Sequence, residues 1–108
     1  MEFLDEVITF SVKNKGNFTL VEFELKRELE PKDLANIKPP DPIRNGFSSN
    51  VVILSGRGPI WLYGYLIHFY HPTRAIAVFD PRLMGAVVVE SHFKEFKAGD
   101  LIKMEEFL

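Results

Sequence analysis

Imidazole side chains are the groups in this sequence best suited to chemistry near neutral pH. His68 and His71 are three residues apart at the end of an apolar segment, and this spacing places them on one face of a helix. His92 follows a run of valines. Such a set can bind a divalent metal ion or transfer protons, and each member can equally be an ordinary surface or helix-end histidine. Spacing alone leaves their roles open.

A glycine-rich turn and an Asp-Pro-Arg segment offer a different chemistry, the binding of phosphate. Residues 55–58 (Ser-Gly-Arg-Gly) separate a short apolar run from Pro59, which opens an apolar helix. The amide groups of a first helical turn attract anions, and glycine lets a ligand approach the backbone closely. Residues 80–82 (Asp-Pro-Arg) end the next apolar run. A tight structural turn and a structural ion pair are the alternative explanations of these two segments.

The arginines are concentrated in the middle of the chain. Four of the five lie between residues 44 and 82, where Asp80 is the only carboxylate and lysine is absent. Arginine can bind phosphate through two parallel hydrogen bonds, whereas lysine suits a solvated surface. The sequence therefore predicts an anion site in the middle third.

Length and composition exclude several classes of protein. The chain has 108 residues, of which 46% are apolar and 26% charged, with a net charge of −2, as expected of one soluble domain spanning residues 1–108. The absence of cysteine excludes disulfides, thiolate catalysis and cysteine-ligated zinc. No apolar run is long enough to span a membrane, and the N-terminus lacks a secretory signal pattern. We expect a cytoplasmic protein that binds neither membranes nor DNA.

An α/β fold must position these residues. Hydrophobic periodicity predicts six strands, at 7–12, 18–25, 51–54, 75–79, 86–89 and 101–104. The first two should form an antiparallel hairpin at a sheet edge. Helices are expected at 31–37 and from 59 to about 70, and the second is apolar nearly all round, which favours burial, in part within a subunit interface. Its place between two apolar strands implies a right-handed parallel crossover.

The order of these elements places the candidate groups at two ends of the sheet. A helix over residues 59–71 is about 20 Å long at 1.5 Å per residue, so it begins near one edge and ends near the other. One end carries the glycine-rich turn and the Asp-Pro-Arg segment, and the other carries the histidines. His71 therefore cannot readily reach Asp80 within one chain. We expect a composite site between two copies.

Several segments together resemble a small family of CRISPR-associated proteins found with type III systems, within the CRISPR-associated Rossmann-fold superfamily. They are Val-Ile-Leu-Ser-Gly-Arg-Gly-Pro-Ile-Trp-Leu (52–62), His-Phe-Tyr-His-Pro-Thr (68–73), Ala-Val-Phe-Asp-Pro-Arg-Leu (77–83), Gly-Ala-Val-Val-Val (85–89) and Ser-His (91–92). The resemblance implies a small Rossmann-like mixed sheet with a right-handed β-α-β unit and an N-terminal antiparallel hairpin.

The same resemblance implies a metal-dependent nuclease that binds short adenosine-rich RNA between stacked dimers. One implied activity is that of a ring nuclease, which destroys the second messenger cyclic tetra-adenylate and so switches off type III CRISPR signalling. The other is the removal of adenosines from the 3′ end of linear oligo-adenylate RNA. The implied cofactor is a divalent metal ion, manganese before others, and the implied assembly is a dimer, a ligand-bridged tetramer or a filament.

The resemblance also assigns roles to single residues. His71, Asp80 and Arg82 are implied to be catalytic, and His71 and Asp80 to hold the metal ion. The remaining residues are implied to bind phosphate or ligand: Ser55, Gly56, Arg57, Gly58, His68 and His92. Two further readings stay open, a module that senses oligo-adenylate without cleaving it and a structural partner of another nuclease.

Overall fold

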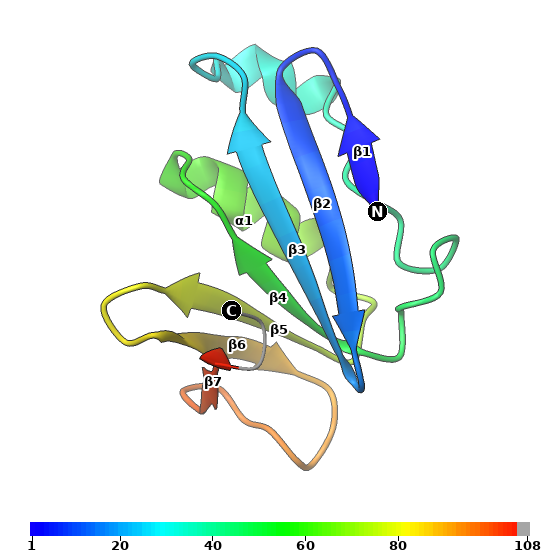
Figure 1. Cartoon of the computed structure of the whole chain (residues 1–108), viewed down its shortest axis with the longest axis vertical. Coiled ribbons are helices and arrows are strands. Elements are labelled where there is room, and N and C mark those ends of the chain that lie inside the picture. Colours follow the sequence, from blue (N-terminus) through cyan, green and yellow to red (C-terminus); the bar gives the residue numbers. More distant parts are fainter. Residues whose placement is uncertain (106–108) are drawn as a thin grey trace.

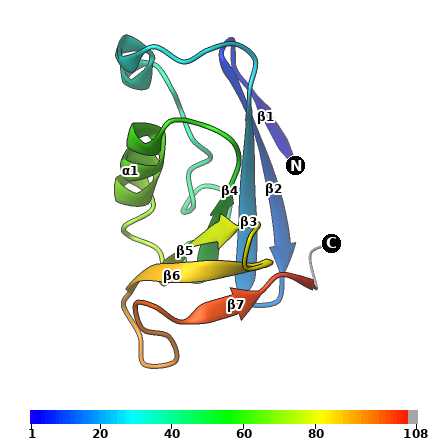
Figure 2. The same ribbon diagram turned by 90° about the vertical axis from the view of Figure 1, so that its left-hand side faces the viewer.

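The computed structural model describes residues 1–105, which form one seven-stranded mixed sheet with its strands in sequence order. The strands are β1 (Glu2–Leu4), β2 (Ile8–Lys15), β3 (Phe18–Leu25), β4 (Val51–Ser55), β5 (Ala75–Asp80), β6 (Gly85–Ser91) and β7 (Leu101–Lys103). Helix α1 (Ile60–Phe69) and the short 3-10 helix η1 (Pro31–Ala35) lie on one side of the sheet (Figures 1 and 2). Strands β3, β4 and β5 are parallel to one another, and the other neighbours are antiparallel. The predicted α/β class is confirmed.

The N-terminal hairpin forms where the sequence predicts it. β2 and β3 pair from Ile8↔Leu25 to Lys15↔Phe18, and Gly16 in the turn has a φ of 58°, which favours glycine. However, β1 pairs with β2 on its outer side and β4 pairs with β3 on its inner side. The predicted position at the sheet edge was wrong, because a three-residue strand, too short to show an alternating pattern, extends the sheet.

The parallel strands at the centre of the sheet are covered on both faces. Every residue of Val51–Leu54 is at most 1% exposed, as expected of a wholly apolar strand. One core lies under α1, and a second core lies on the other face, where the partly buried Phe93 and Phe96, which follow β6, pack against it. Helix α1 connects β4 to β5, and these two strands are parallel, so the predicted strand–helix–strand unit is present.

Helix α1 buries one side only. Leu62 and Leu66 are fully buried, whereas Ile60 is 88% exposed and Trp61 is 36% exposed. The helix is therefore not buried all round within one chain, and burial of its remaining apolar surface in a subunit interface stays a prediction. The physical reason is that α1 is the outermost layer on its side of the sheet (Figure 2).

A bulge interrupts the pairing of β5 with β6. Ala77 pairs with Val88, but the preceding residue Ile76 pairs with Glu90, so Val89 is an extra residue on β6. One extra residue moves all the following side chains to the opposite face of the sheet. The run of three valines carries no alternation that reveals this shift in the sequence.

Candidate functional site

His71 lies in a firmly bonded turn that follows α1. The Tyr70 backbone N–H donates to the Leu66 carbonyl at 3.0 Å, and the buried Tyr70 hydroxyl donates to the Pro40 carbonyl at 2.8 Å. The buried Thr73 hydroxyl donates to the Tyr70 carbonyl at 2.7 Å. Burial raises the pKa of the Tyr70 phenol, so this hydroxyl stays protonated and keeps its donor role. The turn thus holds His71 near the start of β5.

Glu90 and His92 reach the same place from β6 because of the bulge. Glu90 pairs with Ile76, whose side chain belongs to the core under α1. Paired residues point to the same face of a sheet, so Glu90, and His92 two residues later, lie on the α1 face. In an uninterrupted strand they would share the face of Val88, which belongs to the core on the other side. The His92 backbone N–H donates to the Arg74 carbonyl at 3.0 Å and ties this strand end to the turn.

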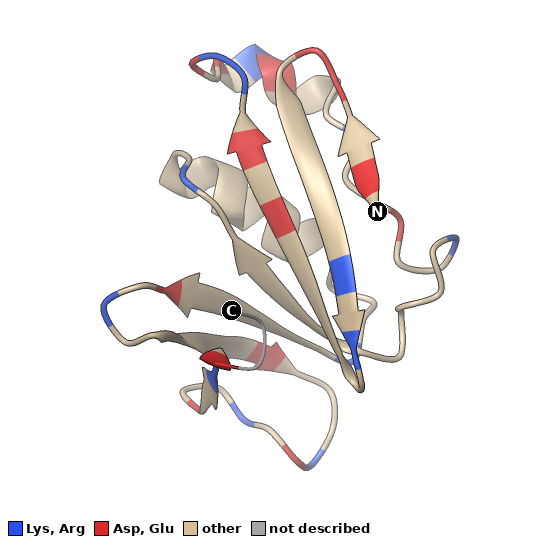
Figure 3. Ribbon diagram, viewed as in Figure 1, with Lys and Arg blue, Asp and Glu red and all other residues tan. Residues whose placement is uncertain are grey.

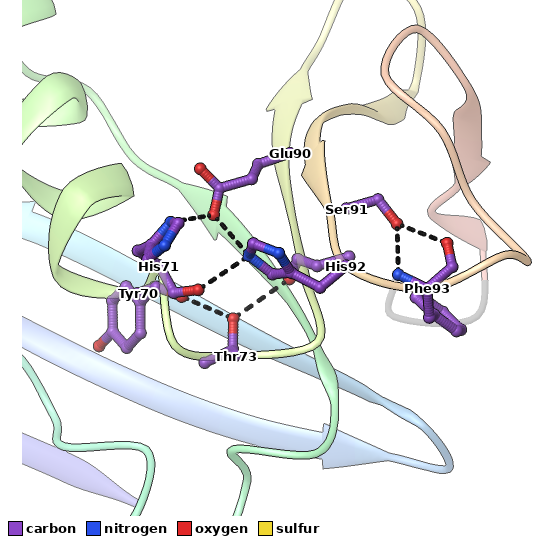
Figure 4. Close-up of polar contacts among 8 residues, drawn as sticks. Tyr70, His71, Thr73, Glu90, Ser91, His92 and Phe93 are labelled. Atoms are coloured by element: carbon purple, nitrogen blue, oxygen red, sulfur yellow. Dashed lines mark hydrogen bonds and ion pairs between the residues drawn. The ribbon is translucent and has the colours of Figure 1, made fainter.

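Three side chains converge at this end of the sheet (Figure 4). His71 Nδ1 lies 2.7 Å and His92 Nε2 lies 2.9 Å from the same oxygen, Glu90 Oε2. His92 Nε2 is also 3.0 Å from the His71 carbonyl oxygen, and the two imidazole rings meet edge to face at 4.9 Å. All three candidate ligand atoms lie within 4.8 Å of one another. We call His71, Glu90 and His92 the histidine–glutamate cluster.

The histidine–glutamate cluster fits a divalent metal ion in the type and number of its donors. Two imidazoles and one carboxylate form a ligand set that leaves coordination positions open for water or substrate. The side chains are 61% (His71), 42% (His92) and 28% (Glu90) exposed, so an ion can reach them from solvent. Imidazole N–H groups now face the carboxylate, and a bound ion would replace those protons.

An open groove of about 570 Å³ borders the cluster. This volume lies within the range of small-molecule sites, about 300–1,000 Å³. The groove adds hydroxyl groups, an aromatic ring and a cation to the two histidines, and its lining residues are Ser48, Ser49, His71, Pro72, Thr73, Arg74, His92 and Phe93. Such a lining suits a small polar ligand with an aromatic part.

The two predicted metal ligands of this chain lie at opposite ends of β5. His71 precedes the start of the strand, where Ala75 pairs with Ser91, and Asp80 is the last residue of the strand. From Ala75 to Asp80 the strand rises about 17 Å at 3.3 Å per residue. This separation agrees with the expectation from the sequence. Asp80 therefore cannot lie beside His71 of its own chain, and the carboxylate beside His71 is that of Glu90.

Asp80 is bonded to Arg82 within the same turn. Arg82 Nη2 donates to Asp80 Oδ2 at 3.0 Å, and the Arg82 backbone N–H donates to Asp80 Oδ1 at 2.9 Å. These hydrogen bonds lower the pKa of Asp80 and raise the pKa of Arg82. The Arg82 side chain is 85% exposed, so the pair is open to solvent and its arginine can exchange the carboxylate for another anion.

The glycine-rich turn has a clear packing role. A Cβ atom on Gly56 would lie 2.6 Å from the Phe23 carbonyl oxygen, and one on Gly58 would lie 3.0 Å from Leu62 Cδ2. The close approach of the turn to Phe23 therefore requires glycine at position 56. The Tyr63 hydroxyl donates to the Gly56 carbonyl at 2.6 Å, and burial raises the pKa of this phenol.

The polar residues of this turn are placed at the edge that the sequence predicts. Ser55 ends β4 at the edge where Asp80 ends the parallel strand β5. Arg57 is exposed and borders a separate groove of about 440 Å³ with Phe23, Glu24 and Leu25.

Lysine and arginine are spread over several loops and strands of the fold (Figure 3). Arg57 and Arg82 follow the carboxyl ends of β4 and β5, whereas Arg74 precedes β5 at the other end. Arg44 lies in the loop between η1 and β4, so the arginines that the sequence predicted at one anion site lie in separate parts of the fold.

The structure separates the two predicted helix-end histidines and adds a residue that the sequence did not single out. His68 is exposed on α1, and its side chain forms no hydrogen bond or ion pair with any residue of the described range 1–105. Glu90 is the missing member of the cluster. The only signal for Glu90 in the sequence is its spacing of two residues before His92. That spacing is informative only after the structure has placed Glu90 and His92 beside His71.

The fold and the cluster together define a small α/β protein with a candidate metal centre at one edge of a mixed sheet. Residues 22–103 match the family model described as CRISPR-associated protein (Cas_csx3). This match spans more than half of the chain, and the chain belongs to this family. A curated protein of Aquifex aeolicus (strain VF5), described as an uncharacterized protein, is 62% identical over 102 residues, which cover 94% of this chain and 92% of that relative.

The match confirms the CRISPR-associated family and indicates a CRISPR-associated role. Within the described residues, no helix has both the length and the apolar character that crossing a membrane requires.

Proposed function

We propose that the protein is a divalent-metal-dependent phosphodiesterase that cleaves cyclic tetra-adenylate and thereby switches off type III CRISPR signalling. The observation that carries this proposal is the histidine–glutamate cluster beside an open groove, in a chain of a CRISPR-associated family. The relation to the Rossmann-fold superfamily belongs to the same proposal. It is supported by the parallel strands β3, β4 and β5 and by the helix that connects β4 to β5.

The cluster would hold the ion through the three atoms that converge, His71 Nδ1, Glu90 Oε2 and His92 Nε2. When bound, a divalent ion such as Mn²⁺ stabilises the negative charge that builds up on the phosphoryl oxygens during cleavage. Before an ion binds, Glu90 orients the His71 ring through Nδ1, and the other ring nitrogen, Nε2, has no partner among residues 1–105. With Nδ1 on the ion, Nε2 carries the proton of the neutral ring, so it can donate a hydrogen bond to a substrate oxygen.

The second half of the site would come from another copy of the chain. Arg57 and Arg82 are exposed cations at the carboxyl edge of the parallel strands, so they can bind substrate phosphates in the charge-assisted manner typical of arginine. If Arg82 exchanged the Asp80 carboxylate for a phosphate, Asp80 Oδ2 would become available as a carboxylate ligand from this half of the site.

Exposed apolar side chains lie next to this second half in the sequence. Ile60 is 88%, Leu83 is 50% and Met84 is 52% exposed, and these residues neighbour the glycine-rich turn or Arg82 in the chain. Apolar side chains gathered around a polar site are typical of a surface that another protein covers. This composition supports self-association at the carboxyl edge.

The test combines two inactive variants. Purified protein is incubated with cyclic tetra-adenylate and Mn²⁺, and His71→Ala and Asp80→Ala are assayed alone and mixed in equal amounts. If facing copies share the site, each variant alone is inactive and the mixture regains about one quarter of wild-type activity, because a quarter of the random pairs unite two intact halves. Lys38→Ala, an exposed residue outside both halves, is the matched control and should retain full activity.

The other outcomes identify the alternatives. Stepwise shortening of linear oligo-adenylate with no effect on the cyclic substrate would replace the proposal with a 3′-exonuclease. Tight binding of the cyclic substrate with no turnover would replace it with a sensor. Activity in the wild type but none in the mixture would show that each copy acts alone.

A further inference from the structure

We propose that Arg74, held on the ring of Phe93, is the phosphate-binding residue of the groove beside the histidine–glutamate cluster. This inference rests on the proposed function, because it names a contact between the groove and an oligo-adenylate backbone. It concerns an arginine at the opposite end of β5 from Arg82, so it adds a cation to the half of the site that otherwise contains only the cluster.

The position of Arg74 is fixed on both sides. Its carbonyl accepts the His92 backbone N–H at 3.0 Å, and its neighbour Thr73 is anchored through the Tyr70 carbonyl. The Arg74 guanidinium carbon lies 4.5 Å from the centre of the Phe93 ring, within the range of a cation–π contact. An arginine over the face of an aromatic ring uses none of its N–H groups on that ring in a conventional hydrogen bond, so they remain available to a second partner.

The guanidinium of Arg74 has no acidic partner in the described part of the chain. The arginine ion pairs there join Arg27 to Asp33 and Arg82 to Asp80, and no ion pair includes Arg74. Glu90 forms part of the cluster, and Glu95 lines a neighbouring cavity with Arg74 but does not form an ion pair with it. Arg74 is thus an exposed cation available to an anion in the groove.

The surroundings of Arg74 complete a phosphate-binding site. Ser48 and Ser49 line the same groove and can donate hydroxyl hydrogen bonds. The cluster by itself has one carboxylate, which balances the single charge of Arg74, so the metal-free groove attracts anions weakly. A divalent ion at the cluster gives the groove a net charge of about +2. Phosphate binding at Arg74 should therefore be tighter when the metal is present.

The experiment measures binding and metal loading separately from cleavage. The probes are inorganic phosphate and 2′-O-methyl tetra-adenylate, which has the phosphates of RNA but lacks the free 2′-hydroxyl. Arg74→Gln should weaken binding of the tetra-adenylate in the presence of Mn²⁺ by about 10- to 100-fold, as expected for the loss of a charge-assisted hydrogen bond. The dependence of log K on log salt should become shallower by about 0.7, the contribution of one phosphate contact on a single strand.

Arg44→Gln is the matched control. It removes the same charge from an exposed arginine that borders a different cavity, so both the affinity and the salt dependence should stay those of the wild type. The Mn²⁺-induced rise in melting temperature should be unchanged in Arg74→Gln, since Arg74 is no metal ligand. A lost response to Mn²⁺ would instead assign Arg74 a structural role and overturn the proposal.

Phe93 is a positioning residue in this proposal, and a double-mutant cycle tests it. Phe93→Leu should weaken binding of the probe in the wild-type background and have no further effect in Arg74→Gln. Independent, additive losses would show that Phe93 does not act through Arg74.

The two proposals fail in different assays. If the wild type binds phosphate through Arg74 but cleaves no adenylate, the proposed function fails and the phosphate site stands. If the wild type cleaves cyclic tetra-adenylate and Arg74→Gln binds both probes normally, the function stands and this inference fails. A wild-type protein that binds neither probe also overturns the inference.

Discussion

Replacing Glu90 by glutamine tests the candidate metal centre without any assumption about the substrate. The substitution keeps the size of the side chain and an oxygen that both imidazole N–H groups can reach, but it removes the negative charge. In the metal-free protein the contacts of Glu90 lie at a half-exposed surface, with His71 61% and His92 42% exposed. Pairs of this kind contribute about 0–1 kcal/mol to the free energy of unfolding.

The response to metal should be much larger than this background change. At a Mn²⁺ concentration one hundred times the wild-type Kd, binding stabilises the folded protein by about 2.7 kcal/mol. A chain of 108 residues gains about 4 °C in Tm per kcal/mol, so the wild-type Tm should rise by about 11 °C. If loss of the carboxylate weakens binding 100-fold, the same Mn²⁺ concentration gives about 0.4 kcal/mol and a rise of about 2 °C.

Thermal unfolding of each protein with and without Mn²⁺ is the assay, and the difference between the two conditions is the readout. Glu22→Gln makes the same change on the exposed face of β3, where Glu22 pairs with Ser55 at the opposite edge of the sheet, and should respond like the wild type. An equal response of Glu90→Gln and the wild type would refute the assignment of Glu90 as a ligand.

Other perturbations give equally definite expectations. Deleting Val89 removes only the extra residue of the bulge and leaves Glu90 on the α1 face, so the fold and the Mn²⁺-induced rise in Tm should both be kept; a lost response would contradict the role given to the bulge. Tyr70→Phe leaves a buried carbonyl without its donor and should lower the free energy of unfolding by about 1–3 kcal/mol in urea titrations, with an unchanged midpoint as the contrary result. Hydrogen bonding from Arg27 lowers the pKa of Asp33 from 3.8 to about 2, so its contribution is complete above pH 4 and is lost as the pH falls toward 2. Asp33→Asn should therefore flatten the fall of stability between pH 4 and pH 2, and a slope as steep as that of the wild type would count against the pair.

Local patterns were sufficient to predict most of the elements. The alternation of apolar and polar residues over Phe18–Leu25 and the apolar run Val51–Leu54 predict strands that the structure contains. The helix after Pro59 also begins where its proline indicates. These signals are local because the backbone of each element depends mainly on its own residues and on the face that they bury. Strand β1 was not predicted from the sequence, because three residues are too few to show an alternating pattern.

The candidate site was predictable in part. The sequence indicates that His71 and Asp80 lie at opposite ends of one strand, because strand and helix lengths follow from residue counts. It does not reveal that Arg82 bonds to Asp80 within the turn, nor that Arg74 rests on Phe93. Those contacts depend on side-chain directions across a turn and between segments, which no periodicity records.

The amino-acid sequence by itself determined the α/β class, the parallel unit around α1 and the presence of histidines at one end of it. Only the tertiary structure decided that Glu90 completes the cluster. The reason is the single extra residue Val89, which shifts the pairing of β6 against β5 and brings Glu90 and His92 to the face where His71 lies. Such a shift depends on pairing between strands, so it is invisible in a run of identical valines.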